Sequence, residues 1–186
     1  MDLKGGIVGL IGDIATTKYD DNLKVSEIIT KKNADSLKMV GLNENINDKL
    51  YKELSIKEKN QVNLASQLTN KIIILKNFSQ GMLKKDLLYY RNLLKKISLY
   101  NRKIVLIENN ADYFLDLVDN IYIINEGDIV FETSDIFNKD LYEYIDMPKI
   151  VEFTYLTKQK GIKIDNYLEF NDLLKAIYRL KEWDIL

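Results

Sequence analysis

The first segment of this sequence that could do chemistry has a pattern similar to that of a phosphate-binding loop. The segment Gly12–Lys18 directly follows the apolar run Ile7–Ile11. A phosphate-binding loop has the pattern G-x-x-x-x-G-K-[ST] between a strand and a helix; its backbone N–H groups and lysine contact phosphates and its hydroxyl holds Mg²⁺. Thr17 replaces the second glycine and Tyr19 replaces the hydroxyl. The pattern leaves two interpretations open: a weakened phosphate site or an ordinary turn. The candidate nucleotide-binding residues are Gly12, Thr16, Thr17 and Lys18.

Short apolar runs must supply the strands that position this segment. They alternate with helical patterns and are rich in Ile and Val, which is typical of strands buried on both faces of a parallel sheet. The runs are Ile7–Ile11, Ile72–Leu75, Ile104–Ile107 and Ile121–Ile124. Between the second and third runs, apolar residues recur every three or four positions from Leu83 to Ile97 and predict an amphipathic helix. Asn125–Asp128 predicts a hairpin turn that leads into a last strand, Ile129–Phe131.

The C-terminal segment predicts helices. Pro148 marks the start of the first, whose apolar face is traced by Ile150, Phe153 or Thr154, and Leu156, and Gly161 ends it. A second helix follows, with an apolar stripe at Phe170, Leu173, Leu174, Ile177 and Leu180. The polar region from Tyr19 to Glu53 is only weakly patterned and gives no assignment. We therefore expect an α/β core at residues 1–147 and a helical extension at 148–186.

Composition excludes several classes of function. The chain has 186 residues, 46% of them hydrophobic, and a formal charge of -1. This charge offers no electrostatic footprint for nucleic acid. With no histidine and no cysteine, the chain has no histidine metal site, no Ser-His catalysis and no thiol chemistry. No apolar run is long enough to span a bilayer, and the start lacks a signal sequence, so we expect a cytoplasmic protein without direct membrane insertion.

The order of the segments resembles the ATP-binding cassette of ABC transporters. Leu54-Ser55-Ile56-Lys57-Glu58 is similar to the signature L-S-G-G-[QE], and Ile72–Leu75 followed by Lys76 and Asn77 is similar to the Walker B strand and its Asp-Glu pair. Gly81 corresponds to the glycine of the D-loop, and Glu108-Asn109 to the family's Thr-His pair. The tail from Pro148 resembles that of energy-coupling-factor ATPases. The resemblance implies a P-loop-NTPase-like, mostly parallel sheet flanked by helices, with a helical C-terminal tail.

Two parts of such a cassette have no counterpart. The chain begins close to the first predicted strand and lacks the antiparallel subdomain that carries an adenine-stacking aromatic. The interval between Lys18 and Leu54 is also too short for the glutamine loop and its strands. The resemblance therefore implies a truncated cassette.

The resemblance also implies that the catalytic positions are degenerate. Lys76 places a cation where the family holds Mg²⁺, Asn77 cannot accept a proton from water, and Asn109 replaces the histidine that contacts the γ-phosphate. Loss of a general base alone costs about 10²–10⁴ in rate. We therefore expect no catalytic residue and no metal or cofactor, with ATP and Mg²⁺ as the open alternative.

Three functions remain open. The first is a noncatalytic, pseudo-ATPase subunit that acts through protein–protein interaction, reaching the inner face of the membrane through its partner. The partner would be an ABC ATPase paralogue, a membrane subunit or a second copy, contacted through Ser55 and Gly81, since ABC domains work as head-to-tail pairs. The second is a residual ATP-binding module. The third is an ATPase that contributes half of a composite site.

Overall fold

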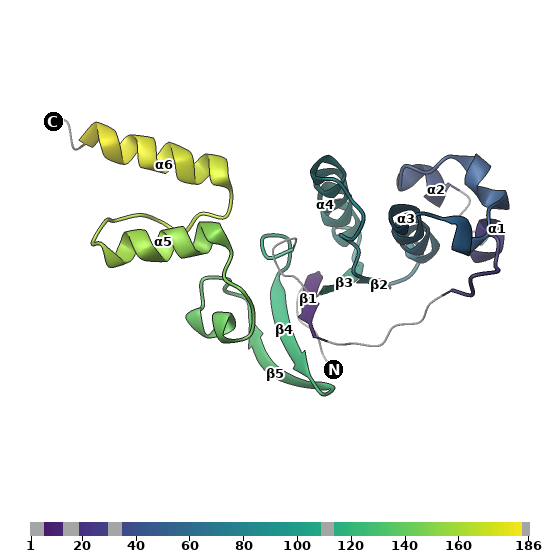
Figure 1. Ribbon diagram of the computed structural model, residues 1–186, viewed down its shortest axis with the longest axis horizontal. Helices are drawn as coiled ribbons and strands as arrows, with labels where there is room; N and C mark the ends of the chain where they lie inside the picture. The colour runs from purple at the N-terminus through teal and green to yellow at the C-terminus, as the bar shows by residue number, and fades with distance from the viewer. Residues whose placement is uncertain (1–5, 13–18, 30–34, 109–113, 184–186) are drawn as a thin grey trace. The chain divides into compact units, whose positions relative to one another are not determined.

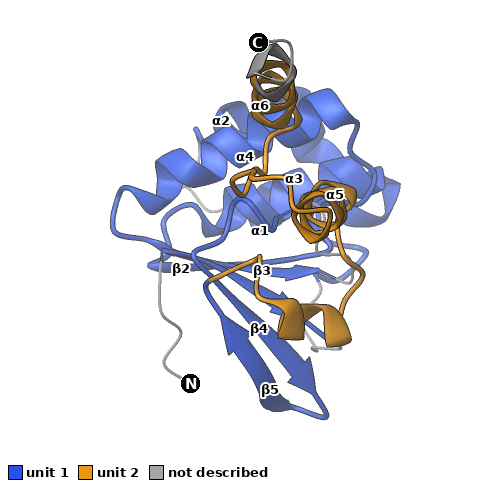
Figure 2. Ribbon diagram, turned by 90° about the vertical axis from the view of Figure 1, so that its left-hand side faces the viewer, with its two compact units in different colours: residues 1–134 blue, residues 135–186 orange. Residues whose placement is uncertain are grey.

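The protein divides into two compact units. The computed structural model describes residues 6–12, 19–29, 35–108 and 114–183. Unit 1 is Met1–Ser134 and unit 2 is Asp135–Leu186, coloured separately in Figure 2. The predicted start of the C-terminal extension, Pro148, lies inside unit 2.

Unit 1 is built on a five-stranded sheet with the spatial order β2-β3-β1-β4-β5. The first four strands in this order pair in parallel, and β5 is antiparallel to β4. The strands are β1 (Ile7–Ile11), β2 (Ile72–Lys76), β3 (Lys103–Glu108), β4 (Asn120–Asn125) and β5 (Asp128–Thr133). The predicted strands and the closing hairpin are thereby confirmed. Figure 1 shows β2 at one end of the sheet and β5 at the other.

Burial separates the central strands from the edge strand β2. All five residues of β1 are buried, as expected for a strand with a parallel neighbour on each side. In β2, by contrast, Ile73 and Leu75 are buried while Ile72 and Ile74 are exposed. The prediction that this run is buried on both faces is therefore wrong. The physical reason is that β2 pairs with β3 alone and only one of its faces is covered.

Helices cover the buried face of β2. Helix α3 (Ile56–Gln67) contacts β2, and helix α4 (Lys84–Ser98) contacts β3, both on the same side of the sheet in Figure 1. Each helix turns buried apolar residues toward the core: Val62, Leu64 and Ala65 in α3, and Tyr90, Leu94 and Ile97 in α4. A second apolar cluster joins β1, β3 and β4 through Val8, Leu10, Val105, Ile107 and Tyr122. The sheet is thus a core element with apolar side chains on both faces of its centre.

The weakly patterned region folds into short helices. These are α1 (Val25–Ile28), α2 (Ser36–Met39), η2 (Glu44–Asp48) and η3 (Tyr51–Glu53). A single bridge between Lys24 and Leu50 and the hydrogen bond from Tyr51 N to Leu23 O connect the two ends of this region. Because none of these helices exceeds five residues, no helical period could develop in the sequence.

Unit 2 contains the predicted C-terminal helices. It comprises η5 (Lys139–Glu143), α5 (Lys149–Gln159) and α6 (Phe170–Trp183). Pro148 is the N-cap of α5, and Gly161 follows its end with φ 80°, so both predicted boundaries are confirmed. The predicted apolar face of α5 is wrong in part: Val151 and Thr154 are buried, whereas Phe153 and Leu156 are exposed.

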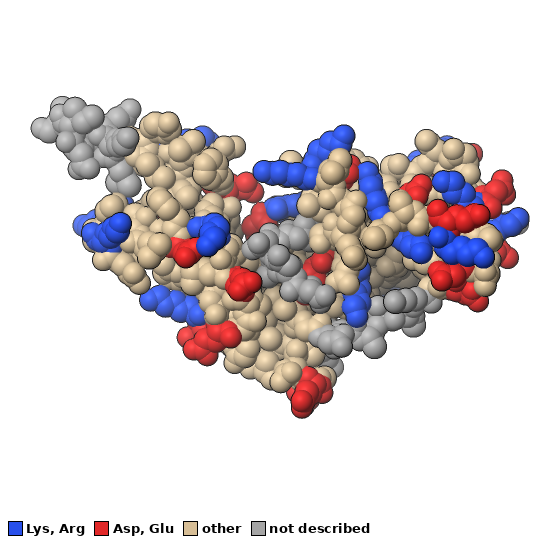
Figure 3. Space-filling view, in the orientation of Figure 1, with Lys and Arg blue, Asp and Glu red and all other residues tan. Residues whose placement is uncertain are grey.

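Charge is mixed on the face of unit 1 that Figure 3 draws, where Lys and Arg side chains lie among Asp and Glu around α1–α4. No helix within the described residues is long and apolar enough to cross a membrane.

Candidate functional site

Three of the predicted site residues, Gly12, Lys76 and Asn77, lie at the carboxyl ends of parallel strands of the sheet. Because β1 pairs in parallel with β3, and β3 with β2, their carboxyl ends point the same way. Gly12 follows β1, Lys76 ends β2 and is followed by Asn77, and Glu108 ends β3. Thr16, Thr17, Lys18 and Asn109 lie outside the described residues. This edge is where an open α/β sheet binds its ligands.

Gly12 is required by the packing of the sheet. Its φ is 144°, a conformation that L side chains rarely adopt. A Cβ atom built there would lie 2.2 Å from the carbonyl oxygen of Ile124 in β4. The glycine therefore has a structural role that is independent of any phosphate.

No helix starts immediately after the phosphate-loop segment. The described residues 19–24 are not helical, and the next helix, α1, begins at Val25. The hydroxyl of Tyr19 is 2.6 Å from the Oγ of Ser66 in α3, and its ring packs edge-on against Tyr51 at 5.5 Å. Phosphate loops depend on the N–H groups and dipole of a helix that begins at the loop. At the described positions this arrangement is missing, and Tyr19 packs against α3 instead.

The turn after β2 is tightly held. Asn77 has φ 49°, and its N–H donates to the carbonyl of Ile107 at 2.8 Å. From α3, the Nδ2 of Asn60 donates to the carbonyls of Asn77 (3.2 Å), Phe78 (3.1 Å) and Gln80 (3.1 Å). One side chain thus satisfies three carbonyls of an irregular segment.

Glu108 holds the same turn from β3. It is buried, and its carboxylate accepts hydrogen bonds from the N–H and the Oγ of Ser79, both at 3.1 Å. Burial raises the pKa of Glu108, an effect that the two hydrogen bonds oppose. Within the described residues, no group of three acidic, histidine or cysteine side chains is placed to hold a metal ion. We assign Glu108 to anchoring the turn.

The resemblance to a cassette places Glu108 at a threonine position and predicts no role for its carboxylate. The available signal was its position: a carboxylate directly continues the apolar run Ile104–Ile107, which the pattern already buries. A charged residue that continues a buried strand needs a hydrogen-bond partner. The identity of that partner, Ser79, depends on the pairing of β2 with β3.

Ser55 and Gly81, predicted to share a partner-facing surface, lie beside each other. Ser55 is the N-cap of α3 and accepts a hydrogen bond from the N–H of Glu58. Gly81, with φ 78°, lies against the first turn of α3: a Cβ atom there would be 3.2 Å from the Cβ of Ile56 and 3.3 Å from the N of Lys57. Both Ser55 and Gly81 are exposed. Their neighbours Ile56 and Leu83 are exposed apolar residues, at 51% and 64%.

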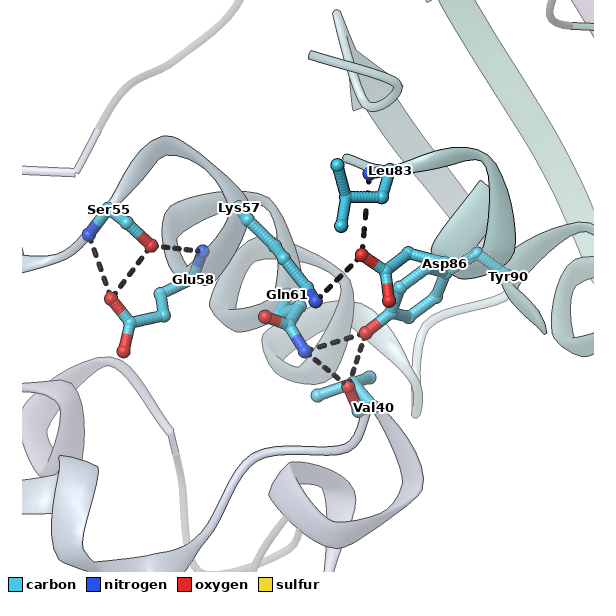
Figure 4. Close-up of polar contacts among 8 residues, drawn as sticks. All are labelled: Val40, Ser55, Lys57, Glu58, Gln61, Leu83, Asp86 and Tyr90. Atoms are coloured by element: carbon cyan, nitrogen blue, oxygen red, sulfur yellow. Dashed lines mark hydrogen bonds and ion pairs between the residues drawn. The ribbon is translucent and has the colours of Figure 1, made fainter. Parts of the chain in front are cut away.

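The N-terminus of α3 is fixed by polar contacts, drawn in Figure 4. Glu58 accepts from the N–H and Oγ of Ser55, both at 2.8 Å, which completes a capping box. Partial burial would raise the pKa of Glu58, but these bonds and the charge of Lys49 outweigh it and lower the pKa. Lys57 forms an ion pair with Asp86 of α4 at 2.9 Å. These contacts hold the starts of α3 and α4 in register.

A buried polar network joins Gln61 of α3, Tyr90 of α4 and the backbone of Val40. Gln61 Nε2 donates to the hydroxyl of Tyr90 at 2.6 Å and to the carbonyl of Val40 at 2.7 Å (Figure 4). Burial raises the pKa of Tyr90 to about 12, so the phenol stays protonated and donates to Val40 in turn. The network joins the C-cap of α2 to α3 and α4.

The arrangement of the sheet and its helices is shared with solved structures. No family model and no curated protein matches the sequence. A dimeric ATP-binding cassette in a post-hydrolysis state, bound to ADP and Pi, is 18% identical; the match covers 68% of this chain and 62% of the cassette, with a TM-score of 0.53. A second cassette of an ABC transporter, in its ADP conformation, is 19% identical; the match covers 81% and 68%, with a TM-score of 0.51. The chain has the fold of an ABC transporter ATP-binding cassette.

The predicted resemblance is thus confirmed at the level of the fold. A further match, cbiO1 from Clostridium perfringens, part of the ABC transporter complex cbiONQ, is 21% identical with a TM-score of 0.47 and covers 67% of this chain. The chain spans 53% of the length of that cassette and 62% of the dimeric one.

Proposed function

We propose that this chain is a noncatalytic, cassette-like protein that acts by binding a protein partner. The observation that carries the proposal is the segment after β1. Tyr19 is bonded to Ser66 of α3, and no helix begins at residues 19–24 to present its N–H groups to a phosphate. Without this helix, a Mg-ATP site lacks the backbone N–H groups and the helix dipole that would bind the phosphates.

The catalytic positions support the same proposal. In phosphoryl transfer, the protein positions phosphates and neutralises developing charge together with Mg²⁺. At the ends of β1, β2 and β3, Glu108 is the one carboxylate among the described residues, and its oxygens accept from Ser79. Lys76 places a positive charge beside the metal position, and Asn77 has an amide that cannot act as a general base.

The proposed partner surface consists of Ser55, Ile56, Gly81 and Leu83. An exposed Ile56 replaces the glycine expected in a signature, so an apolar contact stands where backbone donors would approach a phosphate. The dimeric cassette among the matched structures supports a partner of the same fold. The partner is an ABC ATPase paralogue, a membrane subunit or a second copy, and through it this cytoplasmic chain would reach the membrane. In this proposal residues 1–147 are the cassette core and 148–186 an added extension.

Calorimetric titration of the purified chain with Mg-ATP tests the noncatalytic part. We expect no saturable binding at micromolar concentration and no phosphate release above the buffer rate. Saturable micromolar binding would instead identify a residual ATP-binding module. Phosphate release that disappears in a Lys18→Ala variant would identify an ATPase half-site.

Quantitative affinity capture from the source cells tests the partner surface. The chain is compared with an Ile56→Asp/Leu83→Asp variant, which places charge on the proposed surface. Leu99→Asp is the matched control, because Leu99 is 84% exposed at the end of α4. We expect the double variant to lose about tenfold or more of its partner and the control to retain it. Equal capture by all three proteins would overturn the proposed surface.

A further inference from the structure

The edge strand β2 presents backbone hydrogen-bonding groups away from the sheet. The carbonyl of Lys71 accepts from the N–H of Lys103, and the N–H of Asn77 donates to the carbonyl of Ile107. Because alternate residues of a strand point their backbone groups to opposite sides, the odd-numbered residues of β2 face β3. Ile72, Ile74 and Lys76 therefore face outward.

A side chain occupies the middle of this outward row. Gln67, the last residue of α3, accepts a hydrogen bond from the N–H of Ile74 through Oε1 at 2.8 Å. Its Nε2 donates to the carbonyl of the same residue at 2.9 Å. The amide therefore makes the pair of bonds that a neighbouring strand would make with Ile74. Its second Nε2 hydrogen is directed to the Oδ1 of Asn63 at 2.7 Å, which fixes the amide in this orientation.

The side chains of β2 would favour association if this edge were open. Ile72 is 53% exposed and Ile74 is 44% exposed. A strand edge that combines unpaired backbone groups with exposed β-branched apolar residues is a template for pairing with another chain. In a pure solution of this protein, the partner is a second copy, which offers an edge strand of its own sheet, β2 or β5.

We propose that Gln67 closes the edge of the sheet, holding the backbone of Ile74 in place of a neighbouring strand and thereby preventing β2 from pairing with a second copy. This role is independent of the function proposed above, because it involves neither the nucleotide positions nor the surface around Ile56. It explains how a sheet that ends at β2 coexists with two exposed isoleucines on its last strand.

A Gln67→Met variant tests the proposal, since methionine keeps the size of the side chain and removes both bonds to Ile74. By sedimentation velocity, we expect the variant to form species larger than the wild type as its concentration rises. Under dilute conditions, the Ile74 amide should exchange with solvent about tenfold faster, while Ile73 and Leu75, which face β3, stay protected. Gln159→Met, at an exposed position at the end of α5, is the control and should behave as the wild type.

A second substitution shows whether association involves this edge. Ile74→Pro removes the outward N–H, which β3 does not use, and proline is tolerated on the open side of an edge strand. We expect Gln67→Met/Ile74→Pro to return to the size of the wild type. The proposal is overturned if Gln67→Met keeps the wild-type size and Ile74 protection. It is also overturned if the larger species persist in the double variant, because they would then form elsewhere.

Discussion

Two segments leave the sheet at the carboxyl ends of its parallel strands, one after β1 and one after β2. They differ in the contacts that hold them. The turn at residues 77–81 is bonded by Asn60 from α3 and by Glu108 from β3, and Gly81 packs on Ile56. After β1, the carbonyl of Ile124 leaves no room for a side chain at Gly12, and the hydroxyl of Tyr19 is hydrogen-bonded to Ser66 of α3. The turn after β2 thus has polar partners on two elements, while the described residues 19–24 that follow β1 in the chain are not helical.

The difference shows what maintains an irregular segment. The turn after β2 has polar partners on two neighbouring elements, so changing it would leave the buried carboxylate of Glu108 and the partly buried carbonyls of Asn77 and Phe78 without their partners. In the segment after β1, the carbonyl of Ile124 leaves no room for a side chain at Gly12. We infer that packing within the fold constrains both the turn after β2 and Gly12.

The largest effect on this comparison is expected at Gly12. Gly12→Ala should lower the free energy of unfolding by about 3–4 kcal/mol without any nucleotide, because the new methyl group meets the Ile124 carbonyl and the φ is strained. Urea unfolding measures the change. Gly127→Ala is the control. The φ of Gly127 is 91°, but a Cβ atom built there would meet no other atom within 4 Å apart from its chain neighbours, so this change should cost only about 1–2 kcal/mol. Equal losses would show that packing at Gly12 is unimportant.

A smaller effect is expected from the support of the turn after β2. Asn60→Ala should destabilise the protein by about 2 kcal/mol, because it leaves three carbonyls without their donor. Hydrogen exchange should increase at residues 78–81 more than elsewhere in unit 1. Asn43→Ala, at an exposed helix cap without a side-chain bond, is the control. A uniform increase in exchange would contradict a local role for Asn60.

The smallest effect is a dependence on pH. Burial raises the folded-state pKa of Glu108 above its ordinary value of 4.5, so the folded protein binds this proton more tightly than the unfolded chain. Stability from this group is therefore present below pH 4.5 and is lost as the pH rises through the folded pKa. Chemical denaturation across this window should show that Glu108→Gln removes this contribution, because glutamine does not titrate.

The pKa of Glu58 is shifted in the opposite direction from that of Glu108. Its folded pKa is lowered, so its contribution is present above pH 4.5 and is lost as the pH falls through the folded value. Glu58→Gln should therefore flatten the pH dependence only on the acid side. If both variants changed the same limb of the stability curve, the assignment of Glu108 as a buried anchor would be wrong.

Much of the fold could be predicted from local pattern. The runs at Ile7–Ile11 and Ile104–Ile107 gave buried strands because both lie inside the sheet. Ile72 and Ile74 could not be predicted as exposed, since exposure depends on whether another strand follows β2. The short helices between Val25 and Glu53 are held by tertiary contacts such as that of Tyr51 N with Leu23 O. Such contacts leave no period in a sequence.

In the candidate site, too, local patterns could be predicted from the sequence and tertiary contacts could not. Ser55 was predicted from the resemblance of Leu54–Glu58 to a signature segment, which is a local pattern, whereas its role as the N-cap of α3 comes from the structure. The partners of Asn60 and Glu108 lie in the turn after β2, so the local pattern shows that Glu108 needs a hydrogen-bond partner but identifies neither that partner nor the role of Asn60.

The pairing of β1 has a consequence for the order in which the chain can fold. Ile7 pairs with Ile104, and Gly9 pairs with Ile121. During synthesis, an entirely apolar N-terminal strand must therefore remain without either neighbour until most of unit 1 has left the ribosome. Such long-range parallel pairing is slow and exposes intermediates to aggregation. Folding in the cell should consequently depend on chaperones more strongly than the stability of the finished protein would suggest.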